Sequence, residues 1–247
     1  MSTSIARRRA PLLRRAAGFA VALGIVFSAA AQPLPSRNLA PGFTTLARDA
    51  KVVLMPVDVE LFSLSAGGVG EPRADWTAAA HGHMKTALDT KTAKLGLKAD
   101  RMTETAADEF GEQVGLHAAV ARSIALHHST GGVWALPTKE GKLDWSFGDA
   151  MKPLAEKTGA QYALFIWVRD SYASAERKAA MAAIAILSLG RVVLGTGVQS
   201  GYASLVDLNT GQVVWFNQIF SATGDLREAT PAAASVDTLL NGFPAMQ

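Results

Sequence analysis

The stretch Ala160–Tyr172 reads AQYALFIWVRDSY and gives the clearest strand signal in this 247-residue chain. Apolar residues dominate its first part, as they do in a strand that is buried on both faces of a sheet. A short helical pattern over Phe147–Thr158 precedes it, and Gly159 suits the left-handed cap that commonly ends a helix. The segment therefore predicts a strand in the interior of a sheet, entered from a helix.

A β-hairpin is predicted towards the end of the chain. The candidate strands Val198–Leu208 and Gln212–Phe220 flank Asn209-Thr210-Gly211, a three-residue loop that ends in glycine. Such a loop is a strong hairpin signal. Thr230-Pro231 then predicts the start of a last helix, because proline is favoured in the first turn, and this helix ends near Asn241.

The part of the chain before the central strand predicts parallel crossovers. Lys51–Phe62 (KVVLMPVDVELF) has the composition of a strand, and Pro56 within it indicates a bulge or a strand edge. After a glycine-containing loop at 63–73, we expect a helix, a short strand and a second long helix over residues 75–95, 97–102 and 105–128. The order of elements predicts an α/β fold. Its mixed sheet has parallel crossovers first and a C-terminal antiparallel hairpin, with helices packed on it.

Residues 1–31 are typical of a cleavable signal peptide. Five arginines come first, Ala16–Phe27 is uncharged and mostly apolar, and Ser28–Ala31 are small. We expect cleavage before Gln32, a single α/β domain over residues 32–247, and a periplasmic location. Without the leader, the 24 basic residues fall to 19 against 21 acidic ones, a net charge of −2, so we expect no nucleic-acid partner. Because the sequence contains no cysteine, we predict that the protein has no disulfide and no lipid anchor.

Motifs of catalysis, metal binding and nucleotide binding are not matched. Gly67–Gly70 fits neither phosphate-loop spacing, and Gly197–Gly201 misplaces its serine by one position relative to a nucleophile elbow. The pairs His81–His83 and His127–His128 fall on predicted helices, where their side chains diverge. We therefore predict no catalytic residue, no metal and no cofactor. A catalytic triad assembled in space is the alternative.

The candidate binding residues are Trp76, Trp134, Trp145, Arg169 and Asp170. Arg169 and Asp170 end the central strand, and the favoured interpretation is an ion pair in water. The tryptophans of the polar segment 131–146 either anchor a partner or fold back onto the core. Trp76 borders a segment, Gly67–Trp76, that is a candidate groove for a small molecule.

An apolar insert over residues 175–197 follows the central strand. Its core, Ala179–Leu189, is 11 residues long and precedes Arg191. It is too short to span a bilayer, which needs roughly 18 to 20 residues, so we predict a buried helix. Docking to a partner, or contact with a membrane through residues 179–194, is the alternative.

Two segments carry a resemblance to known proteins. GAQYAL at Gly159–Leu164 and ASLVDLNTGQVVW at Ala203–Trp215 resemble parts of a group of envelope proteins. The group includes the curli-secretion channel subunit, the amino-terminal domain of TolB and the lipoprotein activators of penicillin-binding proteins. The strand containing Val57-Asp58-Val59 fits the same layout. The cysteine that bears the lipid in many members is absent here, and the resemblance assigns no site residue.

The resemblance implies a largely non-catalytic protein. We therefore predict a periplasmic cell-envelope accessory or assembly protein that acts by protein–protein contacts, with another envelope protein or with itself. The alternatives are a periplasmic hydrolase with a spatially assembled triad and a small-molecule-binding domain.

Overall fold

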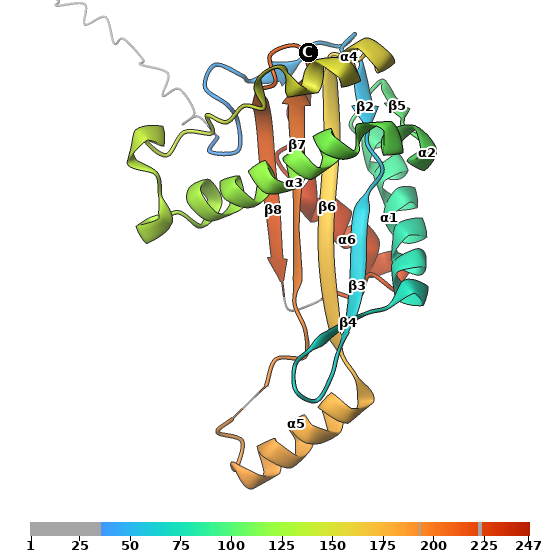
Figure 1. Cartoon of the computed structure of the whole chain (residues 1–247), viewed down its shortest axis with the longest axis vertical. Coiled ribbons are helices and arrows are strands. Elements are labelled where there is room, and N and C mark those ends of the chain that lie inside the picture. Colours follow the sequence, from blue (N-terminus) through green and yellow to red (C-terminus); the bar gives the residue numbers. More distant parts are fainter. Residues whose placement is uncertain (1–35, 193, 222–223) are drawn as a thin grey trace, which may run out of the picture. The chain divides into compact units, whose positions relative to one another are not determined.

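The computed structural model describes residues 36–192, 194–221 and 224–247, so the predicted signal peptide at 1–31 lies outside the described residues. The described strands form a seven-stranded mixed sheet and a separate two-stranded sheet. Figure 1 shows helices covering the larger sheet. Two clusters of buried apolar side chains fill its two faces. The predicted α/β class with a mixed sheet is confirmed.

The central strand of the large sheet is β6 (Tyr162–Ala173), close to the bounds predicted from the sequence. β7 (Gln199–Asp207) pairs antiparallel with β6, and β8 (Val213–Ser221) pairs antiparallel with β7. The turn of this predicted hairpin needs its glycine: Gly211 has φ +70°, and a Cβ there would lie 2.1 Å from the carbonyl oxygen of Gly148. The hairpin prediction is confirmed.

The predicted strand at 51–62 is two strands that share one side of β6. β2 (Val52–Leu54) pairs parallel with the start of β6, and β3 (Asp58–Leu64) pairs parallel with its end. Pro56 lies in the break between them, where it has no N–H to donate to the ladder. The interruption predicted at Pro56 is therefore present.

Short strands complete the sheets. β5 (Ala99–Arg101) pairs parallel with β2, and β4 (Gly70–Pro72) pairs antiparallel with β3. β4 lies in a segment predicted to be a loop, because its three residues show no alternation. β1 (Thr45–Leu46) pairs parallel with β9 (Ala245–Met246) in the separate two-stranded sheet.

Helices cover both faces of the sheet. α1 (Ala74–Lys94) and α6 (Ala229–Leu239) contribute Met84, Leu88 and Val236 to one cluster. The other cluster is covered by α2 (Glu104–Ala107), α3 (Gly111–Ile124) and α4 (Lys152–Thr158).

The single helix predicted at 105–128 is interrupted in the structure. A 3-10 turn at Asp108–Phe110 separates α2 from α3, and a π-helical turn at Ala125–Thr130 follows α3. Phe110 has a non-helical backbone, with φ −113° and ψ 26°, and its side chain is buried in the core. Phe110 is thus buried at the break, on the side of the chain that also buries His117 and Ile124.

The helix of the apolar insert, α5 (Ala175–Leu187), buries none of its residues. The side chain of Ser174 caps it by accepting a hydrogen bond from the backbone N–H of Arg177 at 3.2 Å. Figure 1 shows α5 beyond the end of β6, apart from the helices that cover the sheet. The prediction of a buried helix is wrong, because the helix extends past the strands that would have covered it.

Among the described residues, no helix combines the length and the apolar character that crossing a bilayer requires.

Candidate functional site

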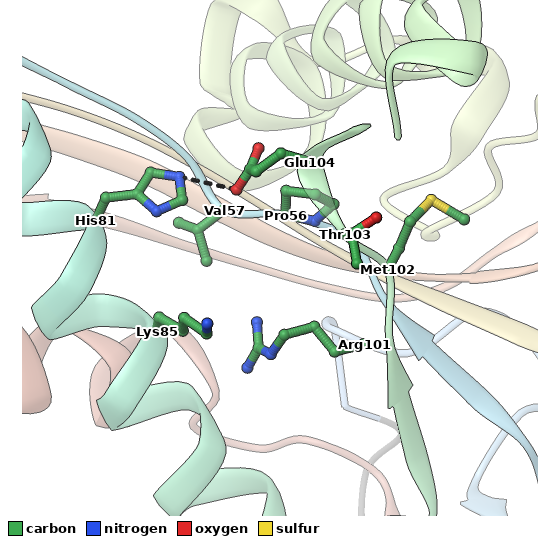
Figure 2. A pocket seen from close by; sticks show the side chains of 8 residues that line it. All are labelled: Pro56, Val57, His81, Lys85, Arg101, Met102, Thr103 and Glu104. Atoms are coloured by element: carbon green, nitrogen blue, oxygen red, sulfur yellow. Dashed lines mark ion pairs between the residues drawn. The ribbon is translucent and has the colours of Figure 1, made fainter. Parts of the chain in front are cut away.

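A groove opens beside Pro56, where the break between β2 and β3 leaves room at the side of the sheet (Figure 2). Its volume is about 560 Å³. Residues from α1, from β5 and from the start of α2 line it, together with the break itself: Pro56, Val57, His81, Lys85, Arg101, Met102, Thr103 and Glu104. The groove exists because the proline interrupts the strand while α1 and α2 continue past it on either side.

The mouth of this groove is cationic. Figure 2 shows the side chains of Lys85 and Arg101 extending towards each other across the opening. Arg101 forms an ion pair with Asp89, whereas Lys85 has no ion-pair partner among the described residues. These two cations suit an anionic group, and the apolar surface of Val57 and Met102 suits a less polar body attached to it.

A contact between His81 and Glu104 lies where this groove meets a neighbouring one. The Nε2 atom of His81 lies 3.4 Å from a carboxylate oxygen of Glu104. Beyond it, a second groove of about 390 Å³ continues along β3 and the start of α3, and Asp58, Asp108 and Val114 line it. The two grooves share Pro56, Val57, His81 and Glu104, so together they form one depression with a basic end and an acidic end.

Arg169 and Asp170 do not form the ion pair predicted from the sequence. Successive residues of a strand point to opposite faces, and these two do so. Arg169 pairs with Asp58 at 2.6 Å and Glu60 at 3.3 Å, and its guanidinium carbon lies 4.6 Å from the ring centroid of Trp167. The ion-pair interpretation is therefore wrong, and Asp170 faces a different environment.

Asp170 is buried and accepts three hydrogen bonds. The donors are the backbone N–H of Ser171 at 2.7 Å, the Tyr172 hydroxyl at 2.6 Å and the Gln199 amide at 3.0 Å. Burial raises the pKa of the Asp170 carboxyl, and these hydrogen bonds oppose the rise. The chain thus supplies hydrogen-bond donors of its own to the buried Asp170 carboxyl.

Trp76 belongs to the same region through the ring of Tyr172. The two rings meet edge to face with their centroids 5.8 Å apart. The guanidinium carbons of Arg73 and Arg227 lie 4.2 Å and 4.6 Å from the centroid of Trp76. The structure thus brings Trp76 and Asp170 together through Tyr172, but these contacts occupy the ring of Trp76 and leave little of it for the small molecule predicted at 67–76.

Trp134 and Trp145 behave differently from each other. Trp145 folds back: its ring stacks with that of His127 at 6.4 Å, and the Lys139 ammonium lies 5.1 Å from its centroid. Trp134 is 56% exposed, and the neighbouring Val133 is 93% exposed. Leu126, on the same segment after α3, is also exposed, and these three exposed apolar residues are named here the arm patch (Leu126, Val133 and Trp134).

A histidine and a serine meet inside the core, at a position that sequence reasoning missed. The Nε2 atom of His117 lies 2.9 Å from the hydroxyl oxygen of Ser204, and its ring stacks on Phe165 with centroids 4.3 Å apart. Burial lowers the pKa of His117 to about 3. The signal was available, because His117 shares the apolar stripe of its helix with Phe110 and Ile124.

This pair lacks what a hydrolase needs. His117 and Ser204 are both buried, and no ion pair between His117 and a carboxylate occurs in the described ranges. A serine nucleophile must reach its substrate and its histidine must accept a proton near neutral pH. The geometry is instead that of a neutral imidazole that forms a hydrogen bond with a buried hydroxyl.

Comparison with known proteins gives only distant likenesses. No family model matches the chain, and no curated protein matches it. A PelC dodecamer from Paraburkholderia phytofirmans is similar in structure, with a TM-score of 0.36, 13% identity, and coverage of 82% of this chain and 93% of that one. Lipoprotein GNA1162 from Neisseria meningitidis has a TM-score of 0.31 and 12% identity, and the match covers 78% of this chain and 99% of that one. The C-terminal domain of LpoB from Salmonella enterica has a TM-score of 0.26 and 12% identity, and the match covers 74% of this chain and 87% of that one.

These neighbours include a lipoprotein. Because all three TM-scores are low, the likenesses carry no argument about function.

Proposed function

We propose that this chain is a non-catalytic accessory or assembly protein of the cell envelope, and that it acts through protein–protein contacts. The arm patch is the observation that carries the proposal. Val133 and Trp134 expose large apolar side chains side by side, on a segment rich in 3-10 turns that follows the end of α3. A tryptophan that is partly exposed at such a place is the residue type most enriched among the anchors of protein interfaces.

The local structure holds Trp134 in place for this role. The backbone oxygen of Trp134 lies 2.7 Å from the Nδ1 atom of His127, and the neighbouring His128 is fixed by contact with the backbone oxygen of Arg37 at 2.7 Å. The base of the patch is therefore attached to the folded body while its side chains face outward. An anchor that is ordered before binding loses less conformational entropy on binding.

The hydrolase alternative receives no support from the described side chains. The His117–Ser204 pair is buried, and the low pKa of its imidazole makes it a poor general base. The small-molecule alternative has one observation in its favour, which is the cationic mouth formed by Lys85 and Arg101. It remains the second candidate, with an anionic ligand as its expected occupant.

Photo-crosslinking in intact cells tests the proposal. A photoreactive amino acid placed at Val133 should give a crosslinked product with another protein or with a second copy of the chain. Val69 is the matched control, because it is also an exposed valine but lies alone in the β3–β4 turn. Equal labelling from both positions, or none from Val133, would contradict the proposal.

The compartment is tested separately by sequencing the amino terminus of the protein recovered from cells. We expect it to begin at or near Gln32. Retention of Met1 on a cytosolic protein would contradict the envelope location in this proposal.

A further inference from the structure

The apolar insert ends in the most exposed aliphatic cluster of the described chain. Ile186, Leu187 and Leu189 are 75%, 84% and 81% exposed, and Val192 follows them. These four residues are named here the α5 tip. Soluble proteins rarely leave several large aliphatic side chains together in water, so this cluster is expected to be covered by something else.

The backbone turns sharply at the α5 tip. Leu189 has φ +52° and Gly190 has φ +76°, so the chain reverses immediately after α5. A positive φ is unfavourable for leucine, and turns of this kind more often use glycine or asparagine. The turn places an exposed leucine at the end of the insert, where a polar residue would be easier to accommodate in water.

The composition of α5 indicates what kind of environment covers it. Ala179–Leu187 contains no polar residue, so this part of the helix is apolar around its whole circumference. A groove on a partner protein covers one face of a helix and leaves the opposite face to water. A helix that is apolar on every side is typical of a surrounding apolar medium.

Charge is arranged at the two ends of the apolar segment. Arg177 and Lys178 precede it and Arg191 follows it, whereas Glu176 is the one acidic residue in the sequence from Ala175 to Val198. Arg177 also fixes the base of the insert, because it donates hydrogen bonds to the backbone oxygen of Gly195 at 3.2 and 3.0 Å. An apolar segment bordered by cations complements a lipid surface with anionic headgroups.

We propose that α5 lies along one leaflet of a bilayer that contains anionic lipids, with the α5 tip among the acyl chains and with Lys178 and Arg191 at the level of the headgroups. A helix of 13 residues is about 20 Å long, less than the roughly 30 Å hydrocarbon core, so the tip enters the membrane without crossing it. This contact is separate from the arm patch, and neither surface depends on the other.

A fluorescent probe at the tip tests the proposal. The chain has no cysteine, so Leu187→Cys gives a single attachment site for an environment-sensitive dye. With vesicles of phosphatidylethanolamine and phosphatidylglycerol, we expect the emission to shift to the blue. The same dye on Val133→Cys should not shift, because that position is exposed but lies outside the insert.

Vesicle flotation measures the strength of the contact. Replacing Ile186, Leu187 and Leu189 with serine should weaken binding by about tenfold for each side chain. Lys178→Gln and Arg191→Gln should each weaken it by about fivefold on anionic vesicles and leave binding to neutral phosphatidylcholine vesicles unchanged. All these residues lie outside the core, so the variants keep the fold, which circular dichroism checks.

Two results would overturn the proposal. One is an unshifted emission at Leu187→Cys together with flotation that the serine substitutions do not change. The other is a blue shift that appears without vesicles as the protein concentration rises, because a second copy of the chain would then cover the tip.

Discussion

His117 should make the free energy of unfolding depend steeply on pH below neutrality. Its imidazole is buried against Phe165 and bonded to Ser204, and burial lowers its pKa from 6.5 to about 3. In the unfolded chain the imidazole takes up a proton at about pH 6.5, whereas in the folded chain it stays neutral until about pH 3. The stabilisation is therefore complete above pH 6.5 and is lost progressively as the pH falls towards 3.

The magnitude follows from linkage. Each pH unit between these two pKa values costs about 1.4 kcal/mol, so acidification from about pH 7 to about pH 4.5 should remove about 3 kcal/mol through His117 alone. Urea denaturation followed by circular dichroism at several pH values measures this loss. An NMR titration of the imidazole reports the pKa in the folded state directly.

Carboxyl groups also titrate in this range, so the measurement needs a matched variant. The double substitution His117→Phe with Ser204→Ala removes the imidazole and leaves no unpaired hydroxyl in the core. The unaltered chain should lose about 3 kcal/mol more than this variant over the same interval. Parallel stability curves for the two proteins, or an imidazole that titrates near 6.5 in the folded state, would refute the reasoning.

Three further predictions concern stability and are measured by urea denaturation at neutral pH. Tyr172→Phe should cost about 2 kcal/mol, because the hydroxyl that bonds Asp170 and the backbone N–H of Leu226 is lost; Tyr162→Phe is its control, and equal costs would contradict the network. Gly211→Ala should cost about 2 kcal/mol or more, because of its positive φ and the nearby Gly148 backbone, whereas Gly67→Ala has open space and should cost far less. Leu187→Ser should stay within about 0.5 kcal/mol of the unaltered chain, while Leu205→Ala in the core should cost about 3 kcal/mol; a large effect of Leu187→Ser would mean that α5 packs on the body.

The elements that the sequence predicts well are those whose signals are local. The run of apolar residues in β6 marks a central strand by itself. The hairpin turn is also self-contained, because the Asp207 carboxylate accepts hydrogen bonds from the backbone N–H groups of Asn209 and Thr210. The break at Pro56 follows from the missing N–H of proline.

Other features depend on contacts between distant parts of the chain. β4 exists because β3 offers a partner to three otherwise irregular residues. The exposure of α5 could not be predicted, because an apolar pattern is the same whether a helix is covered by protein or by something outside it. The opposite orientation of Arg169 and Asp170 could have been predicted, since adjacent residues of a strand alternate in direction.

The candidate site residues could be named from the sequence only in part, and their contacts depend on the fold. Trp134 and Trp145 were named from the sequence, but their different fates depend on how the segment after α3 folds back onto His127. The His117–Ser204 pair joins residues 87 positions apart, and the groove joins side chains of α1 to those around β5. Neither can be derived from spacing along the chain.

The break at Pro56 has a consequence for solubility. Because the break divides one long strand into β2 and β3, the strands outside them are β5 and β4, each only three residues long and carrying Asp100, Arg101 or Glu71. Long, flat, uncharged borders are the places where sheets from different molecules stack into aggregates, and short charged ones resist this. On this side of the sheet the proline thus leaves only short, charged strand borders, whereas the nine-residue strand β8 forms the border on the other side.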